Sequence, residues 1–235
     1  MPTSKLQAAA SQRVADEPDT VETTRADRKH RQILDSARTL FLAHGFDPTS
    51  VDAIARHARV SKATLYSHFQ DKETLLLALV EDECRNVGGP LWKLHDGPIE
   101  LEKELRAIAR SFLSRFMDGR GLAMHRLIMS CASRYPEIAD VFMKVGPDRC
   151  DAEVAAFLRA AQAQGLLHIP DIALAAMQFL SLIQGRLILK WSLSMQSPSP
   201  AEYRMLVDGG IKVFLAAYRA ADRKPHACTT RTRRQ

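Results

Sequence analysis

The sequence predicts an all-α protein, in which a small three-helix unit near the N-terminus precedes a larger helical body. Apolar residues recur at three- and four-residue steps along most of the 235 residues, and no segment alternates as a strand would. Two short, well-capped helices stand close together near the N-terminus. No run of about 18 uncharged apolar residues occurs, so we expect no membrane span.

The first helix is predicted at about residues 26–44. Ile33, Leu34, Ala37 and Phe41 follow helical spacing and give one apolar stripe, and Gly45 stands where a helix cap needs a flexible backbone. Residues 1–24 are polar with little periodicity, so we expect a disordered arm there.

A helix-turn-helix is predicted directly after the first helix. A hydroxyl of the run Pro48-Thr49-Ser50 caps the second helix, Ser61 caps the third, and Leu65 and Phe69 turn inward on the third. Such a right-angled pair places one helix in the major groove while the other braces on the backbone. We therefore predict a DNA-binding domain over residues 25–72, completed by a fourth helix at 71–87.

The outward side of the third helix carries donors suited to DNA. Lys62 can reach guanine O6 or N7, Ala63 can contact a thymine methyl, and hydroxyl and basic groups suit phosphate oxygens. The candidate DNA-binding residues are Arg28, Lys29, Thr49, Ser50, Ser61, Lys62, Ala63, Thr64, Tyr66, His68 and Lys72. The alternative is an ordinary helical bundle, in which Tyr66 and Phe69 are plain core residues.

The net charge of +6 is unevenly distributed. Residues 25–72 carry nine basic and five acidic groups, residues 73–221 carry 17 of each, and the tail at 222–235 carries five basic and one acidic. The basic excess thus coincides with the predicted DNA-binding segment and the tail. We expect the tail to be disordered and to aid solubility more than DNA binding.

The body, residues 88–221, is predicted to be helical throughout and to bring the total to nine or ten helices. Helices are expected at about 101–116, 122–134 and 136–164, the last one bent or broken at Gly146-Pro147. Asp171 caps a segment reaching about Met195. The capping box Ser199-Pro200-Ala201-Glu202 starts a final helix to about Ala221.

Two functions are predicted for this body, ligand binding and dimerisation. Aromatic residues and adaptable methionines indicate an apolar pocket; the candidates are Phe112, Phe116, Met124, Met129, Phe142, Met177 and Gln184, with Met143, Phe179, Trp191, His125 and Arg126 as further possibilities. The last two helices are apolar on more than one side, which favours a four-helix interface between two copies. Its candidates are Leu174, Gly185, Leu187, Met205, Gly209, Val213 and Tyr218. For any one of the aromatic and methionine pocket candidates, the alternative is a place in the plain core.

The N-terminal run Ile33-Leu34 … Gly45-Phe46 … Thr49-Ser50-Val51 … Val60-Ser61-Lys62-Ala63-Thr64-Leu65-Tyr66 … His68-Phe69 … Asp71-Lys72-Glu73 resembles the DNA-binding domain of TetR-family transcriptional regulators, over residues 27–80. The resemblance implies phosphate contacts for Thr64, Tyr66, His68 and Lys72, and base reading near Lys62 and Ala63. Arg59 departs from the family, which usually has glycine in this turn. More weakly, Arg134-Tyr135-Pro136 … Gly146-Pro147 … Gly165-Leu166 … Gly185 is similar to the AefR-like C-terminal domain.

These observations predict a cytoplasmic, homodimeric regulator, and favour a repressor that leaves a palindromic operator when a small hydrophobic molecule binds. The alternative is a DNA-binding regulator without such an inducer, controlled by a protein partner or by its abundance. No catalytic motif such as GxSxG, HExxH or a Walker loop occurs, so we expect no enzyme. The scattered histidines and four separated cysteines predict neither a metal site nor a cofactor.

Overall fold

The computed structural model describes residues 24–85, 89–93, 95, 97–185, 187–193 and 199–220. Over these residues the chain forms eleven helices and no strand, only an isolated bridge between Leu167 and Arg219. The all-α prediction is therefore confirmed for the described part. The predicted arm at 1–24, apart from Thr24, and the basic tail at 222–235 lie outside it.

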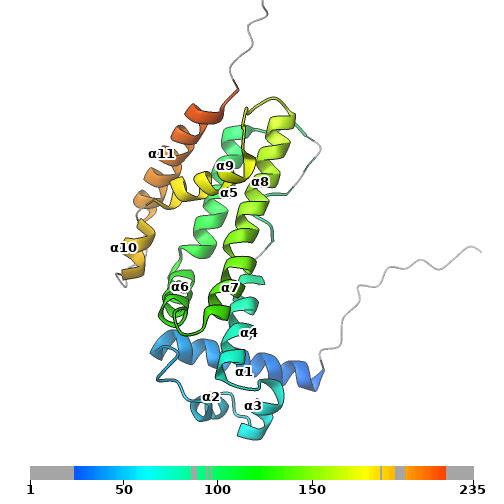
Figure 1. Ribbon diagram of the computed structural model, residues 1–235, viewed down its shortest axis with the longest axis vertical. Coiled ribbons are helices and arrows are strands. Elements are labelled where there is room, and N and C mark those ends of the chain that lie inside the picture. Colours follow the sequence, from blue (N-terminus) through cyan, green and yellow to red (C-terminus); the bar gives the residue numbers. More distant parts are fainter. Residues whose placement is uncertain are drawn as a thin grey trace, which may run out of the picture.

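Four helices form the N-terminal end of the elongated molecule (Figure 1): α1 (Arg25–His44), α2 (Val51–His57), α3 (Lys62–His68) and α4 (Lys72–Arg85). The predicted caps are present, since Ser50 Oγ accepts from the Ala53 amide at 3.1 Å and Ser61 Oγ from the Thr64 amide at 3.0 Å. Helix α4 leaves this end and runs into the body, where it packs against α7.

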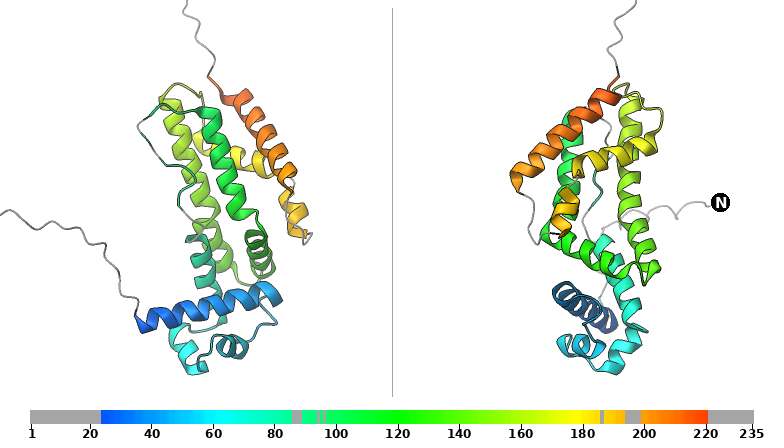
Figure 2. Two further views of the ribbon diagram at one scale, coloured as in Figure 1. Left: turned by 180° about the vertical axis from the view of Figure 1, so that it is seen from behind. Right: turned by 60° about the vertical axis from the view of Figure 1, so that its left-hand side comes forward.

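The body consists of α5 (Leu101–Phe116), α6 (Gly119–Cys131), α7 (Pro136–Val145), α8 (Pro147–Ala163), α9 (Ile172–Gln184), α10 (Leu187–Leu193) and α11 (Pro200–Tyr218). Helices α5 and α8 run along the long axis, while α9 crosses them and α11 leans along one side (Figures 1 and 2). Helix α9 packs mainly against α8 and α11.

Two predicted boundaries have different outcomes. The break at Gly146-Pro147 is confirmed, because α7 ends at Val145 and α8 starts at Pro147. The single segment from Asp171 to Met195 is wrong: Gly185 has a φ of +54° and ends α9, so a separate α10 follows. This break is why the described part holds more than the nine or ten helices expected.

The interior contains two hydrophobic clusters. One joins α5, α8, α9 and α11 within the body. The other is the core of the N-terminal end, and it includes residues of α6, namely Met124, Leu127 and Ile128. Because Leu122 of α6 belongs to the body cluster, helix α6 is packed into both clusters. No described helix is long and apolar enough to cross a membrane.

Candidate DNA-binding surface and ligand cavity

The turn between α2 and α3 has the hydrogen bonds of a Schellman cap. The Val60 amide donates to Ala55 O at 3.0 Å and the Arg59 amide to Arg56 O at 3.1 Å. Arg59 occupies the left-handed position with a φ of 52°, where glycine is the favoured residue. A non-glycine residue in this conformation carries backbone strain.

Arg59→Gly is expected to raise the free energy of unfolding by about 1 kcal/mol, because it relieves the left-handed strain. If the exposed Arg59 side chain also contacts a phosphate, the same variant binds every DNA sequence more weakly. Urea unfolding measures the first effect and a binding titration with random DNA measures the second. Unchanged DNA affinity would remove the phosphate contact and leave Arg59 as a strained turn residue.

Helix α3 presents an exposed polar face. Ser61, Lys62, Ala63, Tyr66 and Ser67 are exposed. Lys62 Nζ lies 2.8 Å from Asp52 Oδ1, and this ion pair raises the pKa of Lys62. The Lys62 side chain is still 55% exposed, so this ion pair does not bury its charge.

The other hydroxyl and histidine candidates lie beside this face. Ser50 is exposed at the start of α2, whereas Thr64 and His68 are half-buried. The Thr64 hydroxyl lies 2.7 Å from Ser61 Oγ.

Two candidates brace the loop between α1 and α2. Thr49 is only 3% exposed and its hydroxyl donates to Gly45 O at 2.7 Å, so its expected role as a surface contact is corrected to a loop support. The ammonium of Lys72 donates to Phe46 O at 3.0 Å and Thr49 O at 3.2 Å and lies 4.2 Å from the Phe46 ring centroid. Its donors are thus already engaged inside the protein, and a phosphate would have to compete for them.

Basic groups also lie along α1, beside α2. Arg28 and Arg31 line a groove of about 410 Å³ with His57 of α2. Lys29 donates to Gln32 Oε1 at 3.2 Å and is half-buried. The His30 ring packs against the Phe69 ring, with centroids 4.7 Å apart. Burial lowers the pKa of His30, and the charge of the nearby His68 lowers it further.

The body contains a cavity of about 800 Å³ between α5, α6, α7, α8 and α9. All seven predicted pocket residues line it: Phe112, Phe116, Met124, Met129, Phe142, Met177 and Gln184. Met143 and His125 line it as well, and burial lowers the pKa of His125. The size and the mixture of apolar walls with a few polar groups are typical of a small-molecule site.

Three further candidates lie elsewhere. Phe179 is fully buried against Phe214, with ring centroids 5.2 Å apart, and Trp191 packs against Tyr203 at 5.8 Å. Arg126 donates to Trp191 O at 3.5 Å. The predictions that these three line the cavity are wrong, because Phe179 and Trp191 belong to the core of the body and the half-buried Arg126 is directed to the backbone of α10.

Two thiols line the cavity, one from α4 and one from α8. Burial raises the pKa of Cys84 to about 11 and that of Cys150 to about 12. Both stay protonated at neutral pH and are poor nucleophiles. In the described ranges, no three His, Cys, Asp or Glu side chains gather as a metal site would require.

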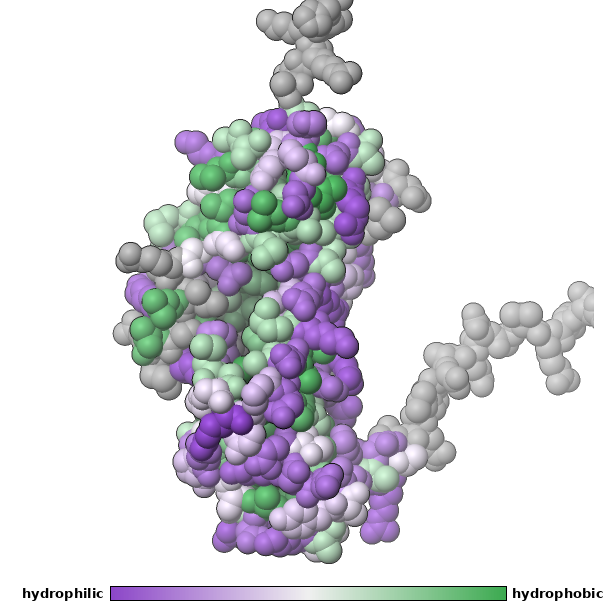
Figure 3. Space-filling view, viewed as in Figure 1, coloured by the Kyte–Doolittle hydropathy of each residue, from purple (hydrophilic) through white to green (hydrophobic). Residues whose placement is uncertain are grey.

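The predicted dimer residues divide into exposed and internal ones. Leu174, Met205 and Val213 are 47%, 61% and 55% exposed on α9 and α11. Apolar residues gather over this upper half of the molecule, whereas the end with α1–α3 is largely hydrophilic (Figure 3). The side chain of Leu187 lies outside the described ones.

Two glycines at this face, Gly185 and Gly210, allow close packing within the single chain. A Cβ added at Gly185 would lie 3.0 Å from the Leu206 side chain, and the neighbouring Gly210 lets α11 approach the backbone of α9 at Leu182. Gly209 has open space beside it. Tyr218 is half-buried and donates to Gln178 Oε1 at 2.5 Å.

Sequence reasoning missed the charged residues of the cavity wall. Glu83 of α4 and Arg120 of α6 line the cavity, and Arg120 Nε donates to Glu83 Oε2 at 2.9 Å. The available signal was Glu83 itself, a carboxylate in register with the apolar stripe of Leu76, Leu79 and Val80.

Comparison with known proteins agrees with this geometry. Residues 33–79 match the family model of bacterial regulatory proteins of the tetR family, and residues 103–220 match that of the AefR-like transcriptional repressor C-terminal domain. The solved structure of the flavonoid-responsive regulator FrrA is 37% identical, with a TM-score of 0.69 over 82% of this chain and 97% of FrrA. A TetR-family regulator from Mesorhizobium loti is 29% identical, with a TM-score of 0.73 over 84% of this chain and 100% of its own.

Among curated proteins, the A-factor receptor protein of Streptomyces griseus is 33% identical over 87 residues, which are 35% of this chain and 32% of the receptor. The chain therefore spans about a third of that relative's length. The HTH-type regulator Mb1581 of Mycobacterium bovis is 28% identical over 77% of this chain and 84% of its own length. The chain belongs to the TetR family of DNA-binding transcriptional regulators, and is not an enzyme.

Proposed function

We propose that the protein is a cytoplasmic, homodimeric repressor that binds a palindromic operator and leaves it when a small apolar molecule occupies the cavity. The observation that carries this proposal is the cavity of about 800 Å³, whose wall includes α4 and α6. Helix α4 completes the DNA-binding end and α6 shares its core, so a guest in the cavity contacts the elements that place α3.

The dimer is supported by the exposed apolar side chains of α9 and α11, among them Leu174, Met205 and Val213. A two-fold dimer presents two copies of α3 with the same symmetry as a palindrome, about 34 Å apart when they enter successive major grooves. DNA contacts are proposed for the exposed face of α3, centred on Lys62, Ala63 and Tyr66. The ligand need only bind more tightly to a conformer in which this spacing is wrong.

The ligand chemistry is supported by the aromatic and methionine side chains of the cavity. FrrA is named as flavonoid-responsive, so a flavanone is a suitable first probe alongside other apolar compounds. A gel-shift on the upstream region of the gene, with random DNA for comparison, tests operator binding. Thermal shift then tests the probe, and stabilisation of about 2.7 kcal/mol is expected at a hundredfold excess over Kd.

Filling the cavity is expected to remove the response to the ligand without removing DNA binding. Ala139 of α7 lines the cavity, so Ala139→Phe should weaken binding of the responsive probe by at least about tenfold through overlap with the guest. Ala156 of α8 is exposed and does not line the cavity, so Ala156→Phe is the matched control. Isothermal titration of the probe into both variants makes the comparison.

A response that survives Ala139→Phe unchanged would place the ligand elsewhere. If instead no apolar compound shifts the melting of the wild type while operator binding is specific, the second candidate is favoured, namely a regulator controlled by a protein partner or by abundance.

A further inference from the structure

Helix α6 forms a wall between the cavity and the DNA-binding end. Met124 and Ile128 of α6 line the cavity and also belong to the hydrophobic core that α1–α4 share. A second contact joins the same parts near the end of α6: Arg134 forms an ion pair with Asp47 of the α1–α2 loop, and Tyr135 packs edge-on against Phe46 with centroids 5.3 Å apart. A shift of α6 would therefore move residues that contact the DNA-binding end.

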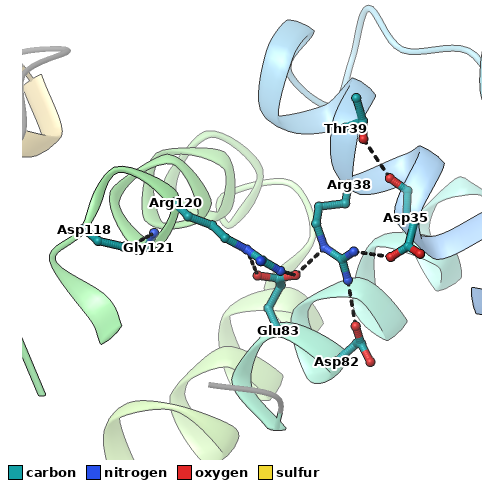
Figure 4. A network of polar contacts seen from close by, with 8 residues as sticks. All are labelled: Asp35, Arg38, Thr39, Asp82, Glu83, Asp118, Arg120 and Gly121. Carbon is teal, nitrogen blue, oxygen red and sulfur yellow. Dashed lines mark hydrogen bonds and ion pairs between the residues drawn. The ribbon is translucent and has the colours of Figure 1, made fainter. Parts of the chain in front are cut away.

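A charged cluster crosses this boundary beside the cavity (Figure 4). The charged cluster consists of Asp35 and Arg38 of α1, Asp82 and Glu83 of α4, and Arg120 of α6. Glu83 lies at its centre: Arg38 of α1 donates to Oε1, and Arg120 of α6 donates to Oε2 at 2.9 Å and to Oε1 at 2.6 Å. One carboxylate thus holds three helices together.

The two arginines meet this carboxylate from different environments. The Glu83 side chain is 10% exposed and that of Arg38 is 18% exposed, whereas that of Arg120 is 58% exposed. Of the cluster, only Glu83 and Arg120 line the cavity. Of these two, Arg120 is the more exposed and the one that a guest can displace, and Glu83 links it to the half-buried Arg38.

We propose that the bridge Arg120–Glu83–Arg38 couples the cavity to the operator-binding end, with Arg120 as the positioning residue that a ligand moves. Any ligand oxygen that accepts hydrogen bonds from Arg120 competes with Glu83 for the same donors. Once Arg120 leaves, Glu83 is paired with Arg38 alone, and the ion pair between α6 and α4 is lost, so that only their apolar contacts remain. The spacing of the recognition helices is then less fixed, and binding to an operator must restore it. The coupling step deepens the proposed function and rests on it.

The bridge can be tested without a ligand. Arg120→Met is expected to weaken operator binding about 5- to 10-fold, while binding to random DNA stays within about twofold, because only the operator requires a fixed spacing. Arg120→Lys keeps one ion pair with Glu83 and should restore operator affinity to within about twofold of the wild type. Fluorescence anisotropy with both DNAs and thermal melting of each variant are the measurements.

Arg85→Met is the matched control. Arg85 is also exposed and follows Glu83 by two residues, but its ion pair is with Glu81 of the same helix, so its loss removes no contact between helices. Its operator affinity should equal that of the wild type. In a double-mutant cycle, Arg120→Met should have little further effect when Glu83 is already replaced by glutamine, because both changes remove the same bridge.

Operator affinity of a folded Arg120→Met that equals the wild type would overturn the proposal. Equal losses in Arg120→Met and Arg85→Met, or full additivity with Glu83→Gln, would overturn it as well, because the effect would then come from charge or stability and not from the bridge. A wild-type protein that binds its operator no better than random DNA would contradict the proposed function instead.

Discussion

Arg38→Met is expected to lower the free energy of unfolding by about 3 kcal/mol, since it removes the cation that three carboxylates share. Arg38 Nη2 lies 2.7 Å from Asp82 Oδ2, and its other nitrogens donate to Asp35 and Glu83. The side chains of Asp82 and Glu83 are 22% and 10% exposed, so solvent screens their charges only partly after the substitution. Methionine keeps much of the arginine's apolar stem, which separates the loss of charge from a loss of packing.

Arg106→Met is the matched control for this substitution. Arg106 also pairs with two carboxylates, Glu102 and Asp208, but their side chains are 51% and 59% exposed. Exposed pairs contribute little, so this variant should lose about 0.5 kcal/mol or less. Urea unfolding of both variants makes the comparison. Similar losses at the two sites would show that burial of the cluster adds nothing to its stability.

The sequence predicts the helices of this protein better than it predicts the cluster. Periodicity and caps place the start of α1, α2, α3 and α11 within a residue or two, because those signals are local. The pairing of Arg38 with Glu83 joins residues 45 positions apart, and no local signal states which helices meet. A carboxylate in the apolar stripe of α4 indicates a buried charge without naming its partner.

The candidate cavity could likewise be predicted only in part from the sequence. Aromatic and methionine residues in the body identify inward-facing side chains, and all seven predicted pocket residues do line the cavity. Phe179 and Trp191 have the same inward pattern yet fill the core. Helical spacing tells which side of a helix is buried, whereas open space depends on how neighbouring helices diverge. The break at Gly185, which separates α9 from α10, is one structural feature that helical spacing did not predict.

Ala63→Glu is expected to weaken operator binding by about 100-fold or more while leaving the fold intact. Ala63 is the second residue of α3 and is exposed on the proposed DNA-contacting face. A carboxylate there is repelled by the DNA phosphates and occupies the space proposed for a base contact. Near a helix N-terminus the same charge is favourable for the helix, so the stability should change by no more than about 0.5 kcal/mol.

Ala201→Glu provides the matched control, because Ala201 is the second residue of α11, is exposed, and lies in the body. The charge change and the position in the helix are the same, so a general effect of net charge on DNA affinity would appear in both variants. Anisotropy titrations at two salt concentrations separate the cases: Ala63→Glu should lose operator affinity at both, whereas Ala201→Glu should match the wild type. If both variants bound the operator as tightly as the wild type, α3 would not be the helix that enters the major groove. The surface groove lined by Arg28 and Arg31 of α1 would then become the leading candidate for the DNA contact.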